Sequence, residues 1–207
     1  MSDNPYWNSY YDTNDQSILN PSSFAIDIAQ RMLKNPKCIL EVGCGNGRDL
    51  RYFNSLGNVC HGFDASQVVL TNQSNDTLSY HQKNVNDIGE EIEKIKPDVI
   101  YTRFFLHSIK YDEMIKFIAA SFDHLEKDSY FVFETRSVND PLCGKGSQTP
   151  NEEDAWYTSH YRRHMRIEDV KNIMEGLGFH IEFIEENFTD SWHKDDHAVV
   201  IRVIAKR

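Results

Sequence analysis

Long apolar stretches are missing from this 207-residue sequence, and so is the usual start of an exported protein. No segment is apolar over enough residues to cross a bilayer. The first five residues, Met1 to Pro5, carry neither the basic residues nor the apolar run of a secretory signal. These absences predict a soluble, cytoplasmic protein that does not insert into membranes.

Cysteine is scarce, and nothing in its placement suggests a metal site. The sequence has no CxxC pair among its four cysteines, Cys38, Cys44, Cys60 and Cys143. The first three fall in or beside expected strands, so we interpret them as small buried thiols. Two histidines close together, at 160 and 164, lack an acidic or cysteine partner at ligand spacing. We therefore predict no metal.

Basic residues are fewer than acidic residues. The chain has 22 lysines and arginines against 32 aspartates and glutamates, which gives a net charge of -10. This balance disfavours attraction to a phosphate backbone, so nucleic acid is not expected as a partner, although a local basic cluster could still bind a small anion. The sequence leaves the oligomeric state open.

Helical and strand periods alternate along a chain whose length suits one domain. Helices are expected at 21–35, 48–56, 66–75, 111–125 and around 170–177. Strands are expected at 38–42, 58–63, 78–83, 97–101, 129–135, 179–185 and 198–205. Such alternation predicts an α/β fold, in which helices cover both faces of a largely parallel sheet. The closing hairpin predicts an antiparallel strand near one edge.

Two segments of the chain fit neither period. Residues 1–20 are polar but rich in aromatics, and they are interpreted either as a lid or arm over a site or as a segment packed onto the body. Residues 136–166 are too long for a simple connection, so we expect a loop that binds substrate. A short helix near 152–157 is a possibility that the sequence leaves open.

A glycine-rich turn follows the first expected strand. Residues 41–47 read EVGCGNG, so glycine stands at 43, 45 and 47 between a strand and a helix. Glycine at such a turn lets the backbone approach a ligand closely. Asp64 ends the next expected strand, where its carboxylate can hold the two hydroxyls of a ribose. A plain tight turn is the alternative, but the order and spacing favour a nucleoside cofactor.

The motif resembles that of the class I S-adenosylmethionine-dependent methyltransferases, which read acidic-x-Gly-x-Gly-x-Gly. A dinucleotide enzyme would need glycine at position 48, which is Arg48. The resemblance covers residues 38 to about 205, strongly in its first third and loosely afterwards. It implies a Rossmann-like three-layer sandwich with a seven-stranded sheet, and S-adenosyl-L-methionine as the cofactor.

The resemblance also implies a set of cofactor-binding residues. The segment 83–88 corresponds to the family's adenine site, with Asn84 in place of the usual Asp, and the segment 98–107 corresponds to its fourth strand. Arg103 could pair with the carboxylate of the cofactor or with the substrate, or could belong to a structural ion pair. The expected residues are Glu41, Gly43, Gly45, Asn46, Asp64, Ala65, Asn84, Val85 and Arg103.

His107 is the expected general base, because histidine has an ordinary pKa near working pH. Its alternative is a histidine packed at a helix start, and His160 and His164 are weaker rivals. Basic residues concentrate in the long loop and its exit, which suggests an acceptor with a phosphate or carboxylate. Pairing with acidic residues of the same loop is the competing interpretation. The expected substrate-binding residues are Arg136, Tyr161, Arg162 and Arg163.

These features predict a methyltransferase that acts on a small molecule. Segments near the N-terminus and at 134–141 resemble small methyltransferases associated with surface sugars, which favours O-methylation of a small anionic or sugar-like metabolite. N-methylation of a small metabolite is the alternative within the enzyme class. A noncatalytic module that binds S-adenosylmethionine is the alternative outside it, and a nicotinamide oxidoreductase comes third.

Overall fold

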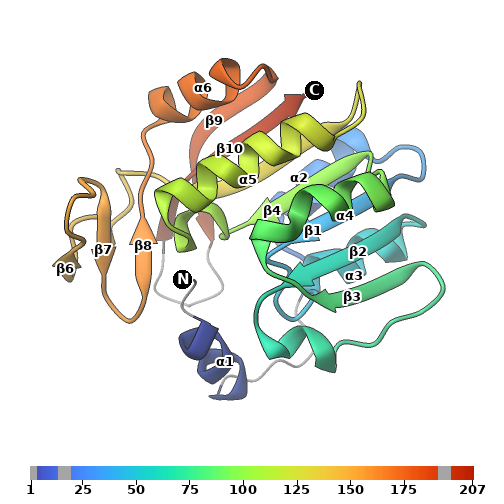
Figure 1. The fold of residues 1–207 in the computed structure, drawn as a ribbon, viewed down its shortest axis with the longest axis horizontal. Coiled ribbons are helices and arrows are strands. Elements are labelled where there is room, and N and C mark those ends of the chain that lie inside the picture. The colour runs from blue at the N-terminus through green and yellow to red at the C-terminus, as the bar shows by residue number, and fades with distance from the viewer. Residues whose placement is uncertain (1–3, 14–19, 191–196) are drawn as a thin grey trace.

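In the computed structural model, which describes residues 4–13, 20–190 and 197–207, a seven-stranded sheet forms the centre of the molecule (Figure 1). Its strand order is β3-β2-β1-β4-β5-β10-β9. The strands are β1 Cys38–Val42, β2 Val59–Asp64, β3 Leu78–Gln82, β4 Val99–Arg103, β5 Tyr130–Arg136, β9 His180–Asp190 and β10 His197–Lys206.

Strand direction in this sheet follows the predicted pattern. β3, β2, β1, β4 and β5 are mutually parallel, and β10 pairs antiparallel with both β5 and β9. The antiparallel strand therefore lies one place in from the β9 edge. Together with helices on both faces, this confirms the predicted Rossmann-like three-layer sandwich.

α2 and α3 cover one face of the sheet, and α4, α5 and α6 cover the other (Figure 1). Phe24 and Ile28 of α2 pack with Leu50 and Phe53 of α3 on one face. On the other face α4, α5 and α6 meet the buried side of β4 and β5. The helices are α1 Asn4–Thr13, α2 Ser23–Met32, α3 Arg48–Ser55, α4 Ile88–Ile95, α5 Tyr111–His124 and α6 Ile167–Gly176.

In the region that follows the second strand, one helix prediction was wrong and one helix was missed. The segment expected as a helix at 66–75 forms only a short 3-10 helix, η1 (Gln67–Thr71), because Asn75 turns back to bridge Leu78. Conversely, α4 was not predicted. Its eight residues bury only Ile88 and Ile92, which is too short a pattern to identify a helical period.

The long segment 136–166 contains a second, three-stranded antiparallel sheet. Its strands are β6 Ser147–Gln148, β7 Ala155–Tyr157 and β8 Tyr161–Arg163. The possible helix at 152–157 is therefore wrong, because Ala155 to Tyr157 pair with β6 and β8. A bridge between Ser137 and Met165 brings the two ends of the segment together. Figure 1 places this small sheet and α1 near the end of the main sheet where β1 to β4 finish.

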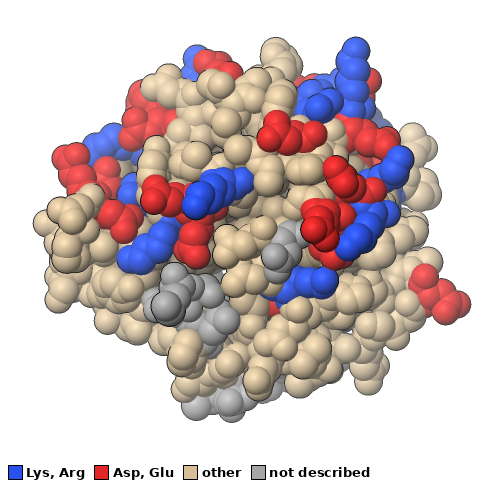
Figure 2. Space-filling model, in the orientation of Figure 1, with Lys and Arg blue, Asp and Glu red and all other residues tan. Residues whose placement is uncertain are grey.

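Charged side chains of both signs are interspersed over the face of the molecule shown in Figure 2. Most of them lie over the helices and the small sheet, whereas the lower part of this view, around α1, carries few. No helix within the described part of the chain combines the length and the apolar character that a membrane span requires.

Candidate active site

The strand order reverses between β1 and β4, and a parallel sheet of this kind binds ligands at the carboxyl ends of the strands beside such a reversal. The glycine turn lies at this point, between β1 and α3. All three of its glycines, Gly43, Gly45 and Gly47, have positive φ angles, of 76°, 52° and 72°. A Cβ atom on Gly45 would clash with the hydroxyl of Tyr11. The turn therefore requires glycine for its conformation and for its close neighbour.

Asp64, the last residue of β2, reaches the glycine turn with its carboxylate. Its Oδ2 accepts from the backbone N–H of Gly45 at 2.8 Å, and its Oδ1 accepts from that of Ser66 at 2.7 Å. Burial raises the pKa of Asp64, and these two hydrogen bonds oppose the rise. Each oxygen has a second lone pair, so the carboxylate can still accept from ribose hydroxyls.

Glu41, on β1, is a buried acid with spare acceptor capacity. Its side chain is 4% exposed, and its Oε2 atom has no hydrogen-bond partner among the described residues. Burial, followed by the nearby Asp49, raises the pKa of Glu41 well above its ordinary value. A positively charged donor placed here would satisfy the orphaned oxygen and restore the ionised form.

The remaining predicted cofactor residues lie along the same strand ends. Asn46 is within the glycine turn, and Ala65 follows Asp64 directly, with its carbonyl accepting from Gln82. Asn84 caps the short 3-10 helix η2 (Val85–Asp87) by accepting from the N–H of Asn86 at 3.1 Å, and Val85 is the first residue of that helix. These positions surround the carboxyl ends of β1, β2 and β3.

Arg103, the last residue of β4, is held within an ion pair. Its Nε donates to Oε1 of the fully buried Glu134 at 2.9 Å, and its guanidinium lies 4.2 Å from the centre of the Phe104 ring. Burial opposes its charge, but Glu134 and Asp49 raise the pKa of Arg103 above its ordinary value. The Nε atom of Arg103 thus takes part in a structural ion pair, which the sequence left as an alternative role for this residue.

The segment after Arg103 connects the glycine turn to the expected base. A Cβ on Gly43 would stand 2.7 Å from the Phe105 ring, so this segment packs directly on the turn. His107 follows in the 3-10 helix η3 (Leu106–Ser108) and is 3% exposed. Its Nδ1 has no partner in the described ranges. The segment therefore joins a side chain packed on the glycine turn to a buried histidine two residues later.

Two further histidines and two arginines approach His107, and we call these five residues the histidine–arginine cluster: His107, His160, His164, Arg136 and Arg162. Burial, followed by the charges of Arg136 and Arg162, lowers the pKa of His107 well below its ordinary value. The same causes lower the pKa of His160 to about 3. At neutral pH the cluster therefore combines neutral imidazoles with permanent positive charge.

Internal pairing already engages part of the basic loop. Arg136 donates to Asp140 at 2.7 Å. Glu152 accepts from both Arg163, at 2.8 Å, and the hydroxyl of Tyr161, at 2.6 Å. Arg162 points differently, because it bonds to the Thr158 hydroxyl and lies close enough to affect His107 and His160.

Helix α1 contacts both the cofactor residues and the small sheet. Beside the Tyr11 contact with the glycine turn, Asn8 accepts from the Ser66 hydroxyl at 2.8 Å and from the N–H of Gln67 at 2.9 Å. The Tyr6 ring lies 4.3 Å from that of His160, centre to centre. Residues 1–3 and 14–19 of the expected arm lie outside the described residues.

Sequence reasoning did not identify Tyr11, Asn8 or Glu134 as site residues. The aromatic content of the arm was a signal for Tyr11. Glu134 also had one, because a carboxylate within the apolar strand FVFET must find a buried partner. Asn8 had none, since its two bonds depend on where α1 lies.

A family model described as a methyltransferase domain matches residues 19–182. The chain belongs to this methyltransferase family. The resemblance to class I S-adenosylmethionine-dependent enzymes is thereby confirmed. No curated protein matches the sequence of the methyltransferase.

Solved structures resemble the methyltransferase at low sequence identity. A 1,6-didemethyltoxoflavin-N1-methyltransferase from Burkholderia thailandensis, with bound 1,6-didemethyltoxoflavin and S-adenosylhomocysteine, has a TM-score of 0.70 at 14% identity, over 98% of this chain and 83% of that one. An S-adenosylmethionine-dependent methyltransferase from Anabaena variabilis reaches 0.73 at 14% identity, over 99% and 93%. The glycopeptide N-methyltransferase MtfA, complexed with S-adenosylhomocysteine, gives 0.65 at 15%, over 95% and 94%. At these identities the similarity shows the fold.

The cofactor of the methyltransferase is S-adenosylmethionine, and the residues at the strand ends fit it. The orphaned Glu41 oxygen suits an ammonium group, and the Asp64 carboxylate keeps acceptor capacity for ribose hydroxyls. The described residues contain no group of three histidine, cysteine or acidic side chains that could hold a metal ion.

Proposed function

We propose that this methyltransferase transfers the methyl group of S-adenosylmethionine to a hydroxyl oxygen of a small, anionic or sugar-like metabolite. The observation that carries the proposal is the histidine–arginine cluster beside the glycine turn. S-adenosylmethionine supplies an electrophilic methyl group, and its transfer is an in-line displacement that depends mainly on alignment and exclusion of water.

The cofactor would be held by residues of β1, β2 and β4. Glu41 accepts from its ammonium group, and Arg103 donates to its carboxylate. The strand register supports these two roles. Glu41 of β1 pairs with Tyr101 of β4, and Arg103 is two residues further along β4, so Glu41 and Arg103 lie on the same face of the sheet. Asp64 accepts from the ribose hydroxyls, with Asn46 and Ala65 beside it, while Asn84 and Val85 meet the adenine.

The acceptor would bind in the histidine–arginine cluster. Arg162 and Arg136 attract an anionic group, and their positive field works against a protonated amine in the same place. The neutral His107 imidazole favours oxygen as the acceptor atom, because a hydroxyl needs a base to become a good nucleophile and a neutral amine does not. Tyr161 and Arg163 would lie beside the acceptor, and both are held by hydrogen bonds to Glu152.

His107 would act as the general base. Its lowered pKa keeps the imidazole neutral at pH 7, so it can take the proton of the acceptor hydroxyl as the oxygen forms its bond to the methyl carbon. Burial excludes water from this step. Helix α1 closes the site through the contacts of Tyr11 with the glycine turn and of Tyr6 with His160.

Turnover with a panel of acceptors tests the proposal. Sugars, sugar phosphates, hydroxy acids and matched amines are incubated with S-adenosylmethionine, and release of S-adenosylhomocysteine is measured. We expect product with hydroxyl acceptors that carry an anionic group. Exclusive turnover of amines would establish N-methylation instead. Tight cofactor binding without turnover of any acceptor, in the panel or in a metabolite extract, would indicate the noncatalytic module.

A further inference from the structure

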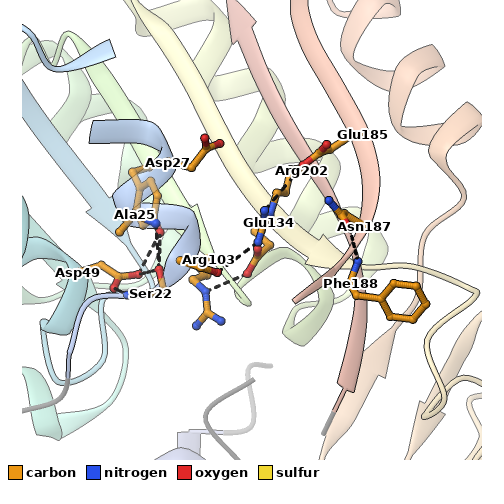
Figure 3. Close-up of polar contacts among 12 residues, drawn as sticks. Ser22, Ala25, Asp27, Asp49, Arg103, Glu134, Glu185, Asn187, Phe188 and Arg202 are labelled. Carbon is orange, nitrogen blue, oxygen red and sulfur yellow. Dashed lines mark hydrogen bonds and ion pairs between the residues drawn. The ribbon is translucent and has the colours of Figure 1, made fainter. Parts of the chain in front are cut away.

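Four charged residues of alternating sign stand side by side across four strands of the sheet. We call them the charge ladder: Arg103 on β4, Glu134 on β5, Arg202 on β10 and Glu185 on β9. The registers pair Arg103 with Glu134, Glu134 with Arg202, and Arg202 with Glu185. Because directly opposed residues point to the same face, the four side chains form one row (Figure 3).

Glu134 is the centre of this row and uses its two oxygens separately. Oε1 accepts from Nε of Arg103 at 2.9 Å, and Oε2 accepts from Nε of Arg202 at 2.8 Å. The carboxylate is completely buried. The Nη1 atom of Arg202 lies 3.7 Å from Oε1 of Glu185, and its Nη2 donates to the Ser23 hydroxyl of α2 at 3.4 Å. Each Glu134 oxygen is therefore bound to a different arginine, one on β4 and one on β10.

Arg103 ends the ladder at the active site. It gives only its Nε to Glu134, and its two terminal nitrogens have no hydrogen-bond partner in the parts of the chain that the structure describes. Figure 3 shows these nitrogens pointing away from Glu134. An arginine tethered through Nε keeps its other two nitrogens available for a carboxylate.

We propose that Glu134 is a positioning residue, which holds the guanidinium of Arg103 toward the carboxylate of the cofactor's methionine moiety. This inference rests on the proposed role of Arg103 in cofactor binding. The Glu134 side chain touches neither the cofactor nor the acceptor. It acts by restricting Arg103 to one orientation before the cofactor arrives, which reduces the entropy lost on binding.

Two ligands separate positioning from general stabilisation. S-adenosylhomocysteine carries the amino acid carboxylate, and 5′-methylthioadenosine has the same adenine, ribose and thioether without it. The dissociation constants of both are measured by calorimetry, and their ratio is the readout. Glu134→Gln keeps the shape of the side chain but cannot accept from both arginines.

We expect Glu134→Gln to weaken S-adenosylhomocysteine about tenfold to a hundredfold, as for loss of a charge-assisted pair, and to leave 5′-methylthioadenosine within about twofold. Arg103→Met removes the guanidinium itself, so it gives the largest change in the ratio that loss of this contact can cause. Arg202→Met and Glu185→Gln are the matched controls, because both alter the ladder without removing the acceptor of Arg103. Their ratios should equal that of the wild type.

Loss of a buried carboxylate between two arginines could prevent folding. The double variant Glu134→Met/Arg202→Met removes one charge of each sign, so it keeps the buried charge balanced, and methionine offers Arg103 no oxygen to bind. Its ratio should change as in Glu134→Gln. Equal weakening of both ligands, or an unchanged ratio in this variant, would overturn the inference. A wild type that binds neither ligand would instead refute the cofactor assignment on which it rests.

Discussion

The two halves of the active site treat their ionisable groups in opposite ways. At the glycine turn, burial raises the pKa of Glu41 and Asp64, whereas in the histidine–arginine cluster burial and neighbouring arginines lower the pKa of His107, His160 and His164. A ligand with positive or hydrogen-donating groups would therefore bind favourably to the first half. A negatively charged ligand would bind favourably to the second half. The contrast matches a cofactor with an ammonium group and hydroxyls on one side, and an anionic acceptor on the other.

The halves also differ in what they use to bind. The proposed cofactor half depends mainly on backbone conformation and on carboxylates near strand ends, and its glycine turn, Glu41 and Asp64 lie within residues 41–64. The proposed acceptor half uses side chains from η3 and β5 and from β8 and the residues beside it, segments up to about sixty residues apart in the chain. Variants in the first half should therefore affect cofactor affinity, and variants in the second should affect turnover or the acceptor.

Gly43→Val should have the largest effect. It places a branched side chain at φ 76° and against the Phe105 ring, so we expect the affinity for S-adenosylhomocysteine to fall about a hundredfold or more. Gly144→Val is the matched control, since Gly144 has φ 78° but nothing within 4 Å of its Cβ position. It should lower stability by about 1–2 kcal/mol without changing affinity in calorimetry. Equal affinities of the two variants would contradict the role of the turn.

His107→Ala should lower turnover about a hundredfold and leave cofactor affinity nearly unchanged, because a base acts on the acceptor proton. The wild-type pH profile gives a second check. The pKa of His107 lies below 6.5, so the imidazole stays neutral above that pH and the acidic limb of kcat should fall below pH 6.5. Loss of cofactor binding together with turnover would show a structural role instead.

Arg162→Met should raise the Michaelis constant of an anionic acceptor about tenfold, with kcat for saturated enzyme less affected. The residual activity should also depend less on salt. Arg163→Met is the neighbouring control, because the Arg163 guanidinium is bound to Glu152 and should contribute less. Similar constants for Arg162→Met and wild type would mean that the cluster does not bind the acceptor's anionic group.

Asn8→Ala should have the smallest effect, because it removes two hydrogen bonds between α1 and the segment after Asp64 without touching the site itself. We expect S-adenosylhomocysteine to dissociate about threefold to tenfold faster, measured by stopped-flow. Gln67→Ala keeps the backbone donor that Asn8 accepts from and should dissociate as the wild type does. A rate unaffected by Asn8→Ala would mean that α1 does not restrain the cofactor.

The sequence predicted the sheet and the glycine turn because both are encoded locally. Each parallel strand is an apolar run that can be recognised from its neighbours in the chain, and the motif at 41–47 lies within one turn. The small sheet was missed for the opposite reason. Its strands have two or three residues, too few for a period, and only their pairing with one another makes them strands.

The roles of the basic residues could not be predicted from order along the chain. Arg162 and Arg163 are adjacent, yet alternation in β8 sends them to different partners, Thr158 and Glu152. The charge ladder joins residues up to about a hundred positions apart, so its partners became identifiable only once strand order was known. Local sequence did signal the need for partners, since Glu134 and Arg202 interrupt apolar strands.

The bridge between Ser137 and Met165 has a consequence for how this fold can change over time. The N–H of Val138 also donates to the carbonyl of Met165 at 3.0 Å, so the segment that carries the small sheet leaves and re-enters the body at one point. A unit joined in this way can be lengthened, shortened or exchanged without moving β5 or α6. Under the proposed function, divergence of acceptor preference has one segment to act on, and we expect grafting of residues 138–164 between members of the fold to alter specificity.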